Sequence, residues 1–116
     1  MNNLIERLKD NNCDVDGAVE RLGDINLYLM LIDGFVKDVS LTEYITAFNK
    51  GDFETAYRHI HSLKGLSASF GFIDLFQISC ELTKAIRSQS YSYTKILNER
   101  LCIEHKKIID IITQNS

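Results

Sequence analysis

Residues 53–71 read FETAYRHIHSLKGLSASFG, and this stretch decides the fold. Asp52, directly before it, is a typical helix N-cap, and Gly71 suits the left-handed residue that ends a helix. Between them, apolar and small side chains recur at spacings of three and four residues, which indicates one buried helical face. The members of this stripe are Phe53, Ala56, Ile60, Leu63, Ser67 and Phe70. The sequence therefore predicts a long amphipathic helix over 53–70.

Helical patterns also precede this stretch. A short helix is predicted over 14–22, with Gly23 as its left-handed cap. The next helix is expected to bury the apolar residues that follow at helical spacing. These are Leu22, Ile25, Leu29, Ile32, Val36 and Val39. Ser40 and Glu43 match a capping box, in which Ser40 is the N-cap of a further short helix that ends at 50–51.

Two more helices are expected after Gly71. Asp74 is a candidate start for the first, residues 88–93 form a polar turn, and the last helix spans about 94–113. The chain of 116 residues contains no proline. Long amphipathic helices joined by short loops pack best as an antiparallel bundle. We therefore predict a single all-α domain over 1–116, an antiparallel four-helix bundle with additional short N-terminal helices.

Composition excludes several classes of function. The formal charge is −3, so the chain lacks the positive field with which proteins bind nucleic acid. The longest apolar run, residues 27–32, is too short to span a membrane, and the N-terminus does not resemble a secretion signal. Three cysteines show no paired spacing, which favours a reducing cytoplasm. We expect a cytoplasmic protein that binds neither nucleic acid nor membrane.

The two histidines of the long helix, His59 and His61, are not equivalent. Residues two apart on an α-helix lie about 160° apart around its axis, so the pair cannot hold one metal ion or one substrate. His61 falls on the solvent side of the helix, whereas His59 falls on the shoulder of the apolar stripe. His59 is therefore interpreted as a boundary residue, and His61 as the candidate for chemistry.

The neighbours of His61 suit phosphoryl transfer. Gly65 lies one turn later and leaves space beside the imidazole, although glycine inside a helix costs about 0.5–1 kcal/mol relative to alanine. Lys64 puts a flexible positive charge one turn from the ring, where a phosphoryl group would sit. A neutral imidazole is a competent nucleophile. An exposed nucleophile, a cation and a cleared path together indicate transfer of phosphoryl groups between proteins.

The same residues resemble a known family. The run HSLKGLSASFGF, residues 61–72, closely resembles the core motif of histidine-containing phosphotransfer (HPt) domains, in which His-x-x-Lys-Gly is followed six residues on by another glycine. Residues 16–35, 47–61 and 75–87 are similar to the family's entry segment, its approach to the active helix and the helix that follows. The resemblance covers about residues 14–112.

The resemblance implies a phosphorelay intermediate. His61 would accept a phosphoryl group from the aspartyl phosphate of a response-regulator receiver domain, or from a hybrid histidine kinase, and pass it to another receiver. The chain would be a phosphocarrier without an autonomous catalytic site or a bound cofactor, because magnesium comes with the receiver. Lys64 would stabilise the phosphoryl charge and Gly65 would leave room for the receiver. A monomer suffices, because the motif needs only one bundle.

One position departs from the family. Many members carry Glu or Gln twenty-two residues after the active histidine, where it can accept from the other ring nitrogen and fix the tautomer. Here that position is Thr83, whose shorter hydroxyl is at best a substitute. Thr83 is therefore a candidate for orienting the His61 ring.

The receiver-docking surface is expected around His61. Its candidate residues are Tyr57, Arg58, Ser62, Gly65 and Ala68. The N-terminal segment offers two readings, because Ile5 and Leu8 either add apolar contact to this surface or close one end of the bundle.

Other readings compete with a relay. His105 continues the apolar spacing of the last helix, which indicates a partly buried packing residue. Cys102-x-x-His105 could offer two metal ligands, but no second pair completes a tetrahedral set. An HPt-shaped adaptor that binds a partner without phosphotransfer is the alternative function, although retention of His61 with Lys64 argues against it. A hydrolase is disfavoured because the chain shows no second polar cluster.

Overall fold

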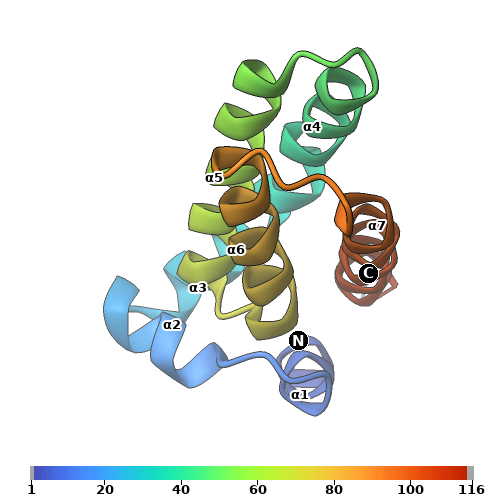
Figure 1. The fold of residues 1–116 in the computed structure, drawn as a ribbon. Coiled ribbons are helices and arrows are strands. Elements are labelled where there is room, and N and C mark those ends of the chain that lie inside the picture. Colours follow the sequence, from blue (N-terminus) through green and yellow to red (C-terminus); the bar gives the residue numbers. More distant parts are fainter. Residues whose placement is uncertain (1, 115–116) are drawn as a thin grey trace.

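The protein is described by a computed structural model, in which residues 2–114 are placed (Figure 1). The helices in chain order are α1 (Asn2–Asp10), α2 (Val15–Leu22), α3 (Ile25–Lys37), α4 (Ser40–Asn49), α5 (Phe53–Phe70), α6 (Ile73–Arg87) and α7 (Thr94–Thr113). The described residues form no β-strand, only an isolated bridge between Cys13 and Phe72. The predicted all-α class is confirmed, and the predicted limits of α5 and α7 agree with the structure.

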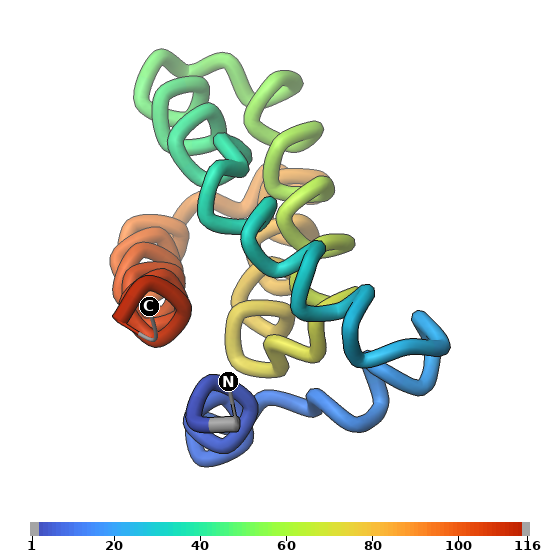
Figure 2. Tube along the Cα trace, turned by 180° about the vertical axis from the view of Figure 1, so that it is seen from behind, coloured from blue at the N-terminus to red at the C-terminus, as the bar shows by residue number. Residues whose placement is uncertain are grey.

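The four-helix bundle is made of α5, α6, α7 and an arm formed by α3 and α4. Figure 2 shows α3 and α4 as one nearly continuous rod beside α5, with a break around residue 38. The most extensive helix contacts are those of α5 with α4 and with α6, and α6 also packs on α7. Because short loops join α4 to α5 and α5 to α6, neighbouring helices run antiparallel. The α2 helix is the short helix that the sequence predicts over 14–22, whereas α1 lies in a segment for which the sequence analysis names no helix.

The core is one continuous cluster of buried apolar side chains. Aromatic rings fill the end where α3 meets the start of α6. Phe35 lies edge-on to Phe72, with ring centroids 5.0 Å apart, and Phe70 stacks on Phe72 at 5.5 Å. The hydroxyl of the fully buried Tyr28 donates to the carbonyl of Phe70 at 2.9 Å, so its polar end is satisfied. These contacts fix where α5 ends.

Local capping rules explain the limits of α2 and α5. The side chain of Asp14 accepts from the amide of Gly17, and Asp52 accepts from the amide of Thr55, so each begins a helix as an N-cap. Gly23 and Gly71 both take left-handed backbone conformations as C-caps. The predictions for the start and end of α2 and α5 are therefore confirmed.

One expectation about α4 is wrong, and one about α3 is correct only in part. Ser40 is the first residue of α4 and not its N-cap; the N-cap is Val39, and the carboxylate of Asp38 accepts from the Ser40 amide at 2.8 Å. In the predicted stripe Ile32 is buried, and Leu22, Leu29 and Val36 pack against the core. Ile25 is exposed, as is Val39, which lies beyond the end of α3. Two aromatic residues that the stripe omitted are fully buried there instead, Tyr28 and Phe35. Their larger apolar surface determines which face turns inward.

The end of α5 is held against the start of α2. The amide of Asp14 donates to the carbonyl of Gly71 at 2.8 Å, and a methyl group added at Gly71 would lie 2.2 Å from the Asp14 carbonyl oxygen. Gly71 also has a φ of 77°, which L side chains rarely adopt. This glycine is thus required by both backbone conformation and close approach.

The α1 helix closes one end of the bundle against the end of α7 (Figure 1). Leu8 is fully buried, and Ile5 packs against the core. The guanidinium of Arg7 donates to the carbonyl of Ile111 on α7. Of the two readings of the N-terminal segment, Leu8 therefore follows the one that closes the bundle.

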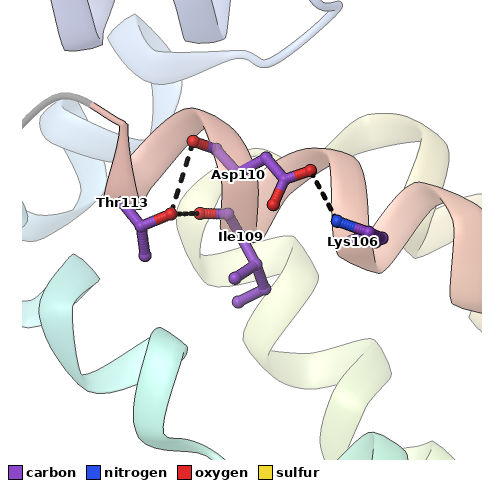
Figure 3. Close-up of polar contacts among 4 residues, drawn as sticks. All are labelled: Lys106, Ile109, Asp110 and Thr113. Carbon is purple, nitrogen blue, oxygen red and sulfur yellow. Dashed lines mark hydrogen bonds and ion pairs between the residues drawn. The ribbon is translucent and has the colours of Figure 1, made fainter.

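The last turns of α7 are held by local contacts (Figure 3). The ammonium of Lys106 pairs with the carboxylate of Asp110 at 2.9 Å, four residues later, and the Thr113 hydroxyl donates to the carbonyl of Ile109 at 2.8 Å. An ion pair between residues four apart adds a few tenths of a kcal/mol to a helix. Both contacts lie near the end of α7 against which α1 packs.

Candidate functional site

Packing of α5 determines which of its residues face solvent. Ile60 and Leu63 are fully buried, so His61 and Ser62 between them point outward and are exposed. The predicted orientation of this helix is confirmed. We use the name His61 face for the outward residues of α5 that the sequence analysis singled out. They are Tyr57, Arg58, His61, Ser62, Lys64, Gly65 and Ala68.

The imidazole of His61 is free of hydrogen bonds and ion pairs to other residues within 2–114. Its ring contact is with Tyr57, one turn earlier, at 6.0 Å between centroids and 31° between planes. Both ring nitrogens are therefore left for an incoming partner. An exposed imidazole on a helix, with no engaged nitrogen, is a nucleophile that another protein can reach.

Gly65 leaves the space beside His61 open. Apart from its chain neighbours and its own helix backbone, nothing lies within 4 Å of where a Cβ at Gly65 would be. Gly65 lies inside the helix and does not have a positive φ. The fold itself therefore does not require glycine here, and alanine would favour the helix by about 0.5–1 kcal/mol.

Lys64 contributes a positive charge that has no carboxylate partner among the described residues. Its side chain is half-buried at the edge of the His61 face, three residues after His61. The nearby Arg58 differs, because its guanidinium lies 3.8 Å from the carboxylate of Glu54 and also contacts Thr55. Lys64 is thus the cation of the His61 face that is available to an anion.

The other candidate docking residues lie on the same face. Ser62 is exposed, and its hydroxyl donates to the Arg58 carbonyl at 3.1 Å within the helix. Ala68 is exposed two turns after His61, and its carbonyl accepts from the guanidinium of Arg21 on α2 at 2.8 Å. Arg21 was not singled out from the sequence, because its contact joins segments 47 residues apart.

Thr83 lies on α6 and is buried, with 5% of its surface exposed. Its hydroxyl donates to the carbonyl of Ser79, one turn earlier in its own helix, at 2.7 Å. No hydrogen bond joins Thr83 to His61 in the part of the chain that the structure describes. The structure thus places Thr83 beneath the surface, engaged with its own backbone.

Arg87 is a residue near the site that the sequence analysis did not single out. It lies one turn after Thr83 on α6, and its guanidinium donates to the hydroxyl of Tyr57. The same guanidinium carbon lies 5.4 Å from the centre of the Tyr57 ring. The signal in the sequence is the spacing of four from Thr83, since residues four apart face the same neighbouring helix.

The remaining histidines have other surroundings. His59 is half-buried at the edge of the apolar stripe, as predicted. His105 is half-buried and its ring lies 5.3 Å from that of Phe35, which confirms a packing residue. Burial lowers the pKa of His105 below its usual 6.5, and the carboxylate of Asp38 opposes this shift. Between residues 2 and 114, no three potential ligands cluster as a metal site.

Fold and site together define a class, a helical bundle that carries an exposed histidine on the outside of one long helix. The sequence matches the Hpt domain family over residues 15–106, most of the chain. The protein therefore belongs to the Hpt domain family. Comparison with curated proteins and with solved structures finds no match.

Membership defines a general role. The family serves histidine phosphotransfer in phosphorelays, and its members are carriers that interact with receiver domains and kinases. No helix in the described part of the chain has both the length and the apolar character needed to span a membrane.

Proposed function

We propose that His61 is the phosphorylated residue of this protein, and that the chain relays a phosphoryl group from the aspartyl phosphate of one receiver domain to a second receiver. The observation that carries the proposal is the exposed, unengaged imidazole of His61 beside the open space at Gly65. In a chain of the Hpt domain family, the imidazole supplies the nitrogen that would accept the phosphoryl group, and the open space at Gly65 supplies the side from which a receiver would approach it.

The transfer requires little of the protein beyond an oriented nucleophile. The Nε2 lone pair of neutral His61 attacks phosphorus, an N–P bond forms, and the bond from phosphorus to the aspartyl oxygen breaks. The receiver regains its carboxylate, and the imidazole proton stays on Nδ1. Magnesium on the receiver and the ammonium of Lys64 offset the charge on the phosphoryl oxygens. The chain thus acts as a carrier that binds no cofactor of its own.

The proposed docking surface is the His61 face. Gly65 and Ala68 present little side chain, so a receiver can approach the helix closely, while Tyr57 supplies an aromatic contact of the kind enriched at interfaces. Arg58 and Ser62 add polar groups at the rim. One bundle provides this whole surface, so a monomer suffices.

The test uses the purified protein and a receiver domain carrying labelled aspartyl phosphate. We expect acid-labile, base-stable label on the wild-type chain and its loss in His61→Gln. The matched control is His59→Gln, which removes the neighbouring imidazole from the same helix and should keep the label. Label that survives His61→Gln, or is lost in His59→Gln, would place the phosphorylated residue elsewhere.

The same experiment separates the relay from the adaptor. An unlabelled wild-type chain that still binds the receiver in a pull-down would show an HPt-shaped adaptor. If His61 is labelled but the label does not pass to a second, unphosphorylated receiver, the relay is contradicted. His61 would then be a phosphoryl acceptor only.

A further inference from the structure

Tyr57 is the side chain whose ring lies against the imidazole of His61. The imidazole makes no hydrogen bond within residues 2–114, and its ring contact is with the Tyr57 side chain at 6.0 Å. Thr83 is buried, and its hydroxyl donates to its own helix at 2.7 Å. The ring neighbour of His61 is therefore on its own helix, and no hydrogen bond reaches the imidazole from the described residues of α6.

Tyr57 is itself fixed from α6. Its hydroxyl accepts from the Arg87 guanidinium, whose carbon lies 5.4 Å from the ring centre. A guanidinium has a planar shape that can both donate and lie against an aromatic ring, which a lysine ammonium cannot reproduce. Two attachments from one side chain on a second helix leave the Tyr57 ring less freedom than packing on α5 alone would.

We propose that Arg87 is a positioning residue for phosphotransfer, which acts on His61 through Tyr57. Arg87 holds Tyr57, and Tyr57 limits the rotation of the imidazole. This arrangement takes the place of the direct hydrogen bond that Thr83 does not make. The proposal rests on the proposed function of His61, but the geometry that it predicts can be measured without any phosphate.

The size of the effect follows from rotamer counting. A histidine in a helix has about two accessible χ1 wells and about two ring orientations, so a released ring spends about a quarter to a half of its time in the productive one. Loss of positioning should therefore slow attack about two- to fourfold. A larger loss would point to direct contact with the transferred group.

The experiment compares Arg87→Gln, Tyr57→Phe and the double variant with the wild-type chain. Tyr57→Phe keeps the ring and the Arg87 charge but removes the hydroxyl that accepts from Arg87. The matched control is Lys84→Gln, which removes a positive charge from an exposed position on α6 one turn away. Phosphoramidate serves as the phosphodonor, because a small donor labels histidine without docking.

Two readouts are used. NMR couplings report the χ1 populations of His61 in unphosphorylated protein, and nuclear Overhauser contacts report the proximity of its ring to Tyr57. We expect one dominant rotamer in wild type and Lys84→Gln, and averaged couplings in Arg87→Gln and Tyr57→Phe. Labelling should slow about two- to fourfold in both single variants, and no further in the double variant.

Three outcomes would overturn the positioning role. One is an unchanged His61 rotamer in Arg87→Gln. Another is slower labelling in Arg87→Gln but not in Tyr57→Phe, which would mean that Arg87 acts directly on the phosphoryl group. The third is a labelling rate that falls when a phosphorylated receiver is the donor but is unchanged with phosphoramidate. That result would make Arg87 a docking residue. If His61 is not labelled in any variant, the proposed function fails, while the NMR rotamers still decide whether Arg87 orients the ring.

Discussion

Gly65 and Gly71 lie six residues apart in the same motif, yet their surroundings are opposite. An added methyl at Gly71 would lie 2.2 Å from the Asp14 carbonyl oxygen, whereas at Gly65 it would meet nothing within 4 Å beyond its neighbours and helix backbone. Gly71 has a φ of 77°, and Gly65 has ordinary helical geometry. The fold thus requires glycine at Gly71 and merely tolerates it at Gly65.

The difference separates structural from functional constraint. Glycine inside a helix lowers stability unless something requires it, and nothing within the described residues requires Gly65. Under the proposed function, the requirement lies outside the chain, in a receiver that approaches the His61 face. Substitutions at Gly71, which is packed against Asp14, and at Gly65, which lies on the His61 face, can test this difference.

The largest effect is expected at Gly71. Gly71→Ala should lower the free energy of unfolding by about 3 kcal/mol or more, because it adds a clash to the cost of a left-handed conformation. Gly51→Ala is the matched control, since its φ is 76° but its surroundings are open. It should cost only about 1–2 kcal/mol in urea unfolding. Equal losses for the two variants would show that Asp14 can move aside.

Gly65→Ala should act in the opposite direction on stability. We expect the free energy of unfolding to rise by about 0.5–1 kcal/mol, and transfer from a phosphorylated receiver to fall about tenfold as the approach is obstructed. Labelling by phosphoramidate should stay unchanged.

The matched control for Gly65 is Gly34→Ala on α3, where an added methyl also meets open space. It should bring the same gain in stability with no loss of transfer. If Gly65→Ala transfers phosphoryl groups as fast as wild type, the functional reason for Gly65 is contradicted, because no partner would then need the space beside it.

A smaller effect is expected from His105 on the packed side. Burial lowers the pKa of His105, so the unfolded chain binds this proton more readily than the folded chain. The stability contributed by the neutral ring is present above the usual pKa of 6.5 and is lost as pH falls through the pKa of the folded state. Asp38 opposes the shift, which keeps the loss modest.

The measurement for His105 is urea unfolding at about pH 7.5 and about pH 5.5, in wild type and His105→Phe. The variant keeps a ring against Phe35 and should lose less stability at the lower pH than wild type. Parallel losses in the two proteins would assign the acid sensitivity to other groups.

The smallest effect is expected at Thr83. Thr83→Val should change the free energy of unfolding by less than about 1 kcal/mol, because its hydroxyl donates to a helix carbonyl and to no other element. The rate of His61 labelling by phosphoramidate should not change. Slower labelling with an intact fold would show that Thr83 orients the ring, which would weaken the role assigned to Tyr57 and Arg87.

Local chemistry made much of the fold predictable. Asp14, Asp52, Gly23 and Gly71 mark helix ends through contacts within a few residues, and the structure confirms each of them. The exposed position of His61 also followed from helical spacing alone. Signals of this kind depend on short stretches of chain, which a sequence displays directly.

The error at Ser40 is local, whereas the others arose where distant segments decide. Ser40 fits a capping box, but α3 ends at Lys37 and the carboxylate of Asp38, two residues before Ser40, accepts from the Ser40 amide. The inward face of α3 depends on Tyr28, which bonds to Phe70 across 42 residues. The contact of Arg87 with Tyr57 likewise depends on how α6 is rotated against α5; the spacing of four from Thr83 indicates the side of α6 on which Arg87 lies but not its partner.

The placement of His61 on the outside of a single helix has a consequence for the order of events. Under the proposed function, one imidazole on one face cannot contact a donor and a recipient receiver together, so the two must bind in turn. An unphosphorylated receiver bound at this face excludes a phosphorylated one. An excess of either receiver therefore slows transfer in both directions. The rate of phosphoryl transfer through such a carrier therefore depends on the relative concentrations of the donor and recipient receivers as much as on the reactivity of the histidine nitrogen.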